Sequence, residues 1–147
     1  MNGLEEAQAR AEAARDAMYA CDRVAHELGM VVSTVGPSMA IVDMTVTETM
    51  CNGLDVCHGG VIFSLADAAM AFASNSLGGT HLASDASIDW LAPARVGDQL
   101  TATAIESARR GRTGLFHVEV RGPEDVIAVF RGKTKMVSTD GPAPAPS

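Results

Sequence analysis

The chain has 147 residues, 47% of them hydrophobic and only 4% aromatic, which is enough for one domain with a mostly aliphatic core. A formal net charge of -7 and a pI of about 4.9 argue against nucleic acid as the main partner. No apolar run approaches the roughly 18 residues that would suggest a membrane-spanning helix. The odd number of cysteines and the lack of a signal-peptide pattern lead us to expect a reducing cytoplasm.

The first part of the chain predicts one helix and two strands. Residues 4–28 place apolar side chains at spacings of three and four, which is typical of an amphipathic helix, and Gly29 is a candidate C-cap. Residues 30–35 form a candidate strand, and the alternation over residues 39–47 predicts a second, half-buried one. We therefore expect an N-terminal helix docked on the domain.

The stretch from Met50 to Asn75 combines a polar, glycine-rich loop with a helix. From Val61 onward the helix is apolar on nearly every face, so it should be buried in the core. Asp67 lies in its middle, where an ionised carboxylate is costly unless it is paired, hydrogen-bonded or open to a site. No basic residue lies one turn away, and we therefore assign Asp67 a functional role.

The remaining sequence predicts strands. The candidates are residues 82–91, 99–108, 113–121 and 126–137, separated by turns rich in glycine, proline and charged residues. The alternating prolines near the C-terminus predict a disordered tail over residues 139–147. The fold class is therefore α+β, with a single domain over residues 1–138 in which an antiparallel sheet wraps one long helix.

The start of the central helix offers an oxyanion site. His58, Gly59 and Gly60 leave backbone N–H groups accessible at the positive end of the helix dipole, which favours a developing negative charge. Gly59 and Asp67 are eight positions apart, or roughly 12 Å along one helix. One chain cannot bring both to a single carbonyl group. If they act together, the protein is a homodimer whose sites combine Gly59 of one chain with Asp67 of the other.

Three motifs resemble the hotdog-fold acyl-CoA thioesterases, in which a curved antiparallel sheet wraps a long helix. They are Asn52-Gly53, His58-Gly59-Gly60 and Ser64-Leu65-Ala66-Asp67. The likeness runs over most of residues 15–137, and it is close enough to indicate the phenylacetate-degradation subgroup. That subgroup acts on phenylacetyl-CoA and its ring-hydroxylated relatives.

The resemblance implies roles for individual residues. Asp67 would be the catalytic carboxylate, as nucleophile or as general base for water, and Gly59 would donate its N–H to the thioester carbonyl. Asn52 would orient water or the carbonyl from the partner chain's loop. Relatives with a hydroxyl one turn after Asp67 use it to hold water; Ala71 stands there, which leaves Ser64 or an ordered water. The family is typically a tetramer built from two dimers, and its reaction needs no metal or cofactor.

Other residues are candidates for binding substrate. His58 and Gly60 shape the helix start, and side chains that could line the acyl pocket are Phe63, Met70, Trp90 and Leu91. Arg131, Lys133 and Lys135 alternate along one strand and so share a face. That row could hold the phosphates of coenzyme A, or it could be solvated charge that discourages strand pairing. Both interpretations stay open.

Three alternatives compete with the thioesterase interpretation. Cys51, Cys57 and His58 could be zinc ligands, but no second pair of ligands follows in the sequence. A hydratase or dehydratase of the same fold would use a histidine with an acid, and the spacing of His58 and Asp67 does not match that pattern. A non-catalytic acyl-CoA binding module is the third, although such a module gains nothing from a buried aspartate.

Overall fold

The computed structural model describes residues 2–142. The helices are α1 (Gly3–Cys21), α2 (Arg23–Glu27), the short 3₁₀ helix η1 (Glu48–Met50) and α3 (Gly59–Asn75). The strands are β1 (Val31–Gly36), β2 (Met39–Thr45), β3 (Thr80–Trp90), β4 (Gln99–Arg110), β5 (Thr113–Arg121) and β6 (Val126–Ser138). Among these residues, no helix has both the length and the apolar character needed to cross a membrane.

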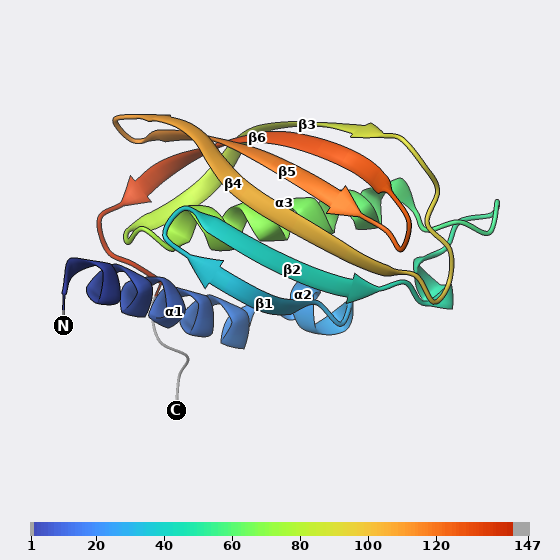
Figure 1. Ribbon diagram of the computed structural model, residues 1–147, viewed down its shortest axis with the longest axis horizontal. Coiled ribbons are helices and arrows are strands. Elements are labelled where there is room, and N and C mark those ends of the chain that lie inside the picture. The colour runs from blue at the N-terminus through green and yellow to red at the C-terminus, as the bar shows by residue number, and fades with distance from the viewer. Residues whose placement is uncertain (1, 143–147) are drawn as a thin grey trace.

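The six strands form one antiparallel sheet in the order β1-β2-β4-β5-β6-β3. Figure 1 shows this sheet curving around α3, with α1 lying beside the edge strand β1. Strands β1 and β3 are the two edges of the sheet. The predicted α+β architecture, one long helix wrapped by an antiparallel sheet, is confirmed.

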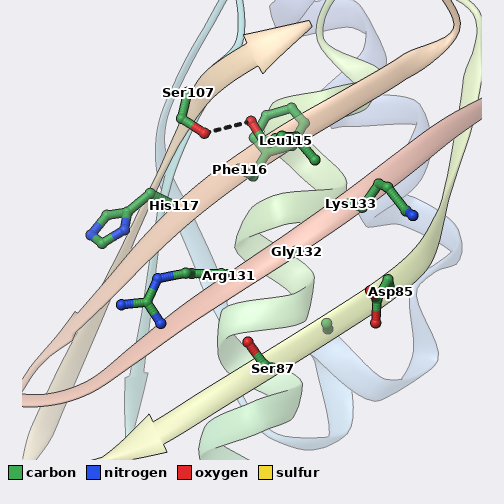
Figure 2. A pocket seen from close by; sticks show the side chains of 10 residues that line it. Asp85, Ser87, Ser107, Leu115, Phe116, His117, Arg131, Gly132 and Lys133 are labelled. Atoms are coloured by element: carbon green, nitrogen blue, oxygen red, sulfur yellow. Dashed lines mark hydrogen bonds between the residues drawn. The ribbon is translucent and has the colours of Figure 1, made fainter.

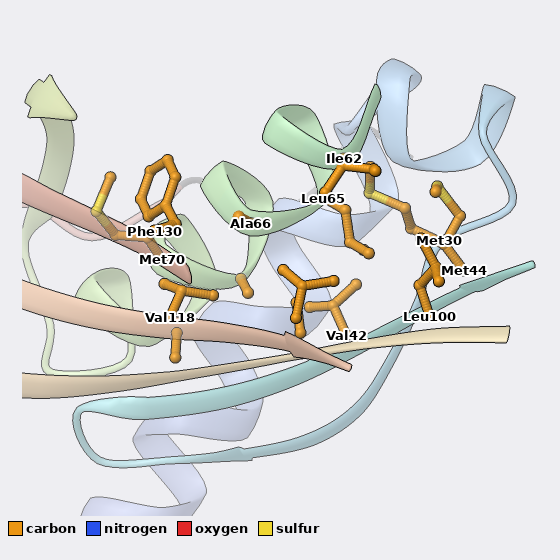
Figure 3. Packing of buried hydrophobic residues seen from close by; sticks show 14 of the residues in the cluster. Met30, Val42, Met44, Ile62, Leu65, Ala66, Met70, Leu100, Val118 and Phe130 are labelled. Atoms are coloured by element: carbon orange, nitrogen blue, oxygen red, sulfur yellow. The ribbon is translucent and has the colours of Figure 1, made fainter. Parts of the chain in front are cut away.

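The core lies between α3 and the inner face of the sheet. Leu65, Ala66 and Met70 of α3 are fully buried there, and they pack with side chains from the strands such as Val118 and Phe130 (Figure 3). Gly132 of β6 allows the close approach of helix and sheet. A Cβ at this position would overlap the Met70 sulfur and lie 2.8 Å from its Cε. The packing thus fixes α3 against β6 and sets which helix face stays partly exposed.

The N-terminal segment differs from the single helix predicted over residues 4–28. The helix breaks at Asp22, which has extended backbone angles and accepts a hydrogen bond from the Ala25 N–H at 2.9 Å. Aspartate favours such N-cap positions, so a second helix, α2, starts there. Tyr19 holds this corner against the domain: its hydroxyl donates to the Met30 carbonyl at 2.7 Å, and its ring lies 6.5 Å from that of Phe72 on α3.

The strands and α3 lie where the sequence predicts them, with ends shifted by at most two residues, whereas the short 3₁₀ helix η1 was not predicted. The predicted disordered tail begins at residue 139, and its first four residues are described. Within them, the Asp140 carbonyl accepts a hydrogen bond from the Thr80 hydroxyl at 2.6 Å. The rest of that prediction, residues 143–147, lies outside the described part of the chain.

Candidate active site

The N-terminus of α3 leaves one backbone donor free. His58 is the N-cap, and its Nδ1 accepts a hydrogen bond from the Gly60 N–H at 3.3 Å. The His58 carbonyl accepts from the N–H groups of the next residues, Val61 and Ile62, at 2.9 and 3.3 Å. The Gly59 N–H has no hydrogen-bond partner within residues 2–142. It is therefore the donor that a ligand oxygen can use at this helix end.

Trp90 packs directly on Gly59. Its indole Nε1–H donates to the Gly59 carbonyl at 3.2 Å, and a Cβ at position 59 would lie only 3.1 to 3.2 Å from three atoms of the ring. The indole is 53% exposed, so part of it remains open to a ligand. The sequence singled out Trp90 as a pocket residue but did not reveal this contact. The two residues are 31 positions apart, and no local pattern links them.

Asp67 lies two turns further along α3 and is half-buried. Its carboxylate makes no hydrogen bond or ion pair with any residue from 2 to 142, so the pairing with an arginine is not observed there. Burial raises the pKa of the Asp67 carboxyl above its ordinary value, and the Asp22 carboxylate raises it further. A raised pKa makes the ionised carboxylate a stronger base. An unpaired carboxylate of this kind is suited to accept a proton or to attack an electrophile.

The helix face that carries Asp67 is only partly covered by the rest of the chain. Ser64, Asp67, Ala68 and Ala71 recur at helical spacing and are all half-exposed, whereas the opposite faces of α3 are buried. The Ser64 hydroxyl donates to the Gly60 carbonyl at 3.0 Å within the helix. A second molecule or a ligand can therefore reach the carboxylate along this face.

The side-chain oxygen of Asn52 is hydrogen-bonded within its own loop. Its Oδ1 accepts hydrogen bonds from the N–H groups of Leu54 at 2.9 Å and Val56 at 3.4 Å. This arrangement is an Asx-type turn, and it fixes the orientation of the side chain. The amide nitrogen of Asn52 has no partner in the described part of the chain. It is the end of the side chain that can donate to substrate or water.

Two predicted pocket residues have different surroundings from one another. Phe63 is half-buried, and its ring lies 5.2 Å from that of Phe130, edge to face. Met70 is fully buried between α3 and the sheet, and its sulfur packs close to Gly132. Met70 does not reach the partly exposed face of α3, because it lies on the side of the helix that faces the sheet. We therefore remove Met70 from the residues expected to touch substrate.

Arg131 and Lys133 lie on the outer face of the sheet, with α3 behind it (Figure 2). They line a groove of about 480 Å³ together with polar residues of neighbouring strands: Asp85, Ser87, Ser107 and His117. Arg131 also forms an exposed ion pair with Asp89, with 3.3 Å between Nη1 and Oδ2. Within one chain, the sheet separates these cations from Asp67.

Residues 54–129 match the family described as the Thioesterase superfamily. The sequence is 43% identical over 122 residues to acyl-coenzyme A thioesterase PaaI of Escherichia coli K12, which covers 82% of this chain and 87% of that protein. It is also 30% identical over 97 residues to acyl-coenzyme A thioesterase 13 of Mus musculus, covering 65% of this chain and 67% of the mouse protein. The solved structure of the PaaI protein from the E. coli phenylacetic acid degradation operon superposes with a TM-score of 0.88 and 40% identity, covering 90% of this chain and 97% of the other.

Proposed function

Since this chain belongs to the thioesterase superfamily, as an acyl-CoA thioesterase with the hotdog fold predicted from its sequence, we propose that it hydrolyses phenylacetyl-CoA and its ring-hydroxylated relatives. The likeness to PaaI over most of both chains supports this choice of substrate. The residues around the helix start support it chemically, because an aromatic side chain, Trp90, is partly open beside the proposed oxyanion donor.

The observation that carries the proposal is that α3 has both a free backbone donor, the Gly59 N–H, and an unpaired, half-buried carboxylate, Asp67. The thioester carbonyl oxygen would accept a hydrogen bond from the Gly59 N–H, and one such donor is typically worth about 3 to 4 kcal/mol in the transition state. Asp67 would attack the carbonyl carbon or deprotonate a water that does. The Asn52 amide nitrogen would donate to the carbonyl or to that water.

Gly59 and Asp67 are roughly 12 Å apart along the axis of one helix, which is too far for both to reach one carbonyl group. We therefore propose a homodimer in which Gly59 acts with the partner's Asp67. Two features of the chain support it: one face of α3 is partly exposed, and no strand of residues 2–142 lies beside the edge of β3 that faces away from β6. The family resemblance implies a tetramer of two such dimers. Light scattering at a concentration used for kinetics measures this, and an active monomer would contradict the shared site.

Arg131 and Lys133 remain proposed contacts for the coenzyme A phosphates. Because they lie on the outer face, the nucleotide would have to pass around the β3 edge or come from a neighbouring chain. Replacing both by alanine should raise KM for a phenylacetyl-CoA substrate and leave hydrolysis of phenylacetyl N-acetylcysteamine, which has no phosphate, unchanged. An equal effect on both esters would show that the two cations do not bind phosphate.

One geometric observation weighs against a hydratase or dehydratase. Such an enzyme would need His58 beside an acid, but the Nδ1 of His58 accepts from the Gly60 N–H and caps the helix. A binding module without catalysis differs from a thioesterase by the absence of turnover.

The test is release of free coenzyme A thiol from phenylacetyl-CoA, a hydroxylated phenylacetyl-CoA and a short aliphatic acyl-CoA. We expect faster release from the aryl esters, and loss of turnover with retained binding in Asp67→Asn. Asp125→Asn makes the same chemical change in an exposed turn and should leave the rate unchanged. A sample without substrate corrects for the protein's own cysteines. Substantial turnover by Asp67→Asn would refute the role of that carboxylate, and no turnover of any ester would favour the binding module.

A further inference from the structure

Two cysteines face each other in the loop that precedes α3. Cys51 and Cys57 are partners in an isolated antiparallel bridge, which closes the loop of residues 52–56. Residues directly opposite in such a bridge place their side chains on the same side of the strand pair. The two thiols are therefore neighbours because of the backbone and not because of a chance side-chain rotamer.

The hydrogen bonds around the bridge define its type. The Asn52 N–H donates to the Val56 carbonyl at 2.9 Å on one side, and the His58 N–H donates to the Met50 carbonyl at 2.8 Å on the other. This pattern is that of a non-hydrogen-bonded pair, in which the two Cα atoms are about 4.5 Å apart and the side chains approach most closely. Disulfides span Cα separations of about 4.4 to 6.8 Å. The backbone thus already meets the requirement for a cross-strand disulfide.

We propose that Cys51 and Cys57 are a modification site: a reversible intramolecular disulfide that forms on exposure to a small-molecule disulfide. In the structure both are free thiols. The Cys51 thiol donates to the Thr47 carbonyl at 3.6 Å and the Cys57 thiol to the His58 carbonyl at 3.8 Å. These are weak hydrogen bonds of sulfur, so rotation about each Cα–Cβ bond can turn the sulfurs toward each other.

The exchange takes place in two steps. The thiolate of Cys51, the partly exposed member, attacks one sulfur of the small disulfide RSSR, which forms a mixed disulfide and releases RS⁻. The thiolate of Cys57 then attacks the Cys51 sulfur and releases the second RS⁻, which takes up a proton. Overall, two protein thiols lose two electrons and two protons, and RSSR is reduced to two RSH.

The burial of the two thiols sets their order. Cys57 is buried, and burial raises the pKa of its thiol to about 11, with the neighbouring Cys51 thiol contributing in the same direction. At neutral pH few Cys57 thiols are ionised, so this residue is a poor first nucleophile and acts as the resolving partner. The bond would close the base of the loop that carries Asn52, directly before His58.

The test uses the whole protein incubated with glutathione disulfide, then treated with an alkylating agent and digested with trypsin. Trypsin cuts after Arg23 and Arg95, so both bridge cysteines lie in fragment 24–95 and the exposed Cys21 lies in a separate one. We expect fragment 24–95 to lose both alkylatable thiols, to be lighter by two hydrogen atoms, and to recover them with dithiothreitol. Cys21→Ser should behave in the same way, whereas Cys51→Ser should give no internal disulfide.

Cys21 reports in the same sample that the oxidant is active. If Cys21 is modified by glutathione while fragment 24–95 keeps two free thiols or carries only glutathione adducts, the proposal is overturned. The readout is a mass and does not depend on the proposed substrate or on catalytic activity. Failure here therefore leaves the thioesterase proposal untouched, and the converse also holds.

Discussion

Replacing Gly59 by alanine tests whether the start of α3 is built around Trp90. The new Cβ would lie 3.1 Å from the indole Cε2 and 3.2 Å from Cζ2 and Nε1, where carbon contacts are optimal at about 3.5 to 4.0 Å. The indole must move by a few tenths of an ångström, and because it is 53% exposed it has room to do so. Its hydrogen bond to the Gly59 carbonyl, already 3.2 Å long, would then be lost.

The size of the effect follows from these contacts. A hydrogen bond of this kind contributes about 0.5 to 1.5 kcal/mol, and its loss is partly offset by the lower backbone entropy that alanine gives up in a helix, about 0.5 to 1 kcal/mol, so Gly59→Ala alone should change the free energy of unfolding by less than about 1 kcal/mol. Once Trp90 is replaced by alanine, the methyl group meets no ring. The substitution at 59 should then be neutral or stabilising, because alanine loses less backbone entropy than glycine in a helix, by about 0.5 to 1 kcal/mol.

Urea unfolding of the wild type, the two single variants and the double variant measures this coupling. The backbone-entropy gain of alanine is the same with and without Trp90, so the two substitutions should interact by about 0.5 to 1.5 kcal/mol, the contribution of the hydrogen bond, whereas independent sites deviate by roughly 0.3 to 0.5 kcal/mol. Additive effects would refute the argument, because they would show that the indole does not constrain position 59. The N–H of residue 59 is present in all four proteins, so the cycle separates packing at this position from its role as a donor.

Three further predictions concern buried positions. Gly132→Ala should destabilise the protein by about 1 to 3 kcal/mol because its methyl group would overlap Met70. The control Gly53→Ala, whose methyl group would meet no atom within 4 Å, should change the free energy of unfolding little. Equal effects of the two substitutions in urea unfolding would contradict this prediction. The Thr134 hydroxyl is buried without a partner in residues 2–142, so Thr134→Val should stabilise the fold by about 1 kcal/mol or more, and a lower melting temperature would argue against it. Because folding raises the pKa of Asp67, ionisation of this carboxyl lowers the stability of the folded protein as pH rises from the ordinary pKa of 3.8 through the folded-state pKa. Asp67→Asn should therefore have a larger free energy of unfolding than the wild type at neutral pH, and the difference should shrink in acid. A difference that does not change with pH would rule out the raised pKa.

Hydrophobic periodicity was enough to predict the long helix, its wrapping by an antiparallel sheet and the order of the strands along the chain. Periodicity cannot show where a polar side chain will interrupt a helix. The stripe over residues 4–28 continues through Asp22, although its carboxylate caps a new helix there. The signal was present in the residue type, since aspartate is a common N-cap, but the apolar spacing outweighed it.

The site was predictable only in part for a similar reason. An aspartate in an apolar helix and a glycine pair at its start are local patterns, and they can be recognised from sequence. The contact of Trp90 with Gly59 depends on how β3 passes the helix end. Alternation correctly placed Arg131 and Lys133 on one face of β6, but it could not show that this face points away from α3.

The order of the sheet makes the candidate site depend on β6, a strand that is synthesised after both α3 and β3. Strand β3 follows α3 directly in the chain, but within residues 2–142 it pairs only with β6, where Trp90 lies opposite Ala128. During translation the indole therefore has no fixed position beside Gly59 until residues 126–138 have left the ribosome. A nascent chain that stops before β6 would contain Asn52, Gly59 and Asp67 and still lack the strand that positions Trp90 against the helix end.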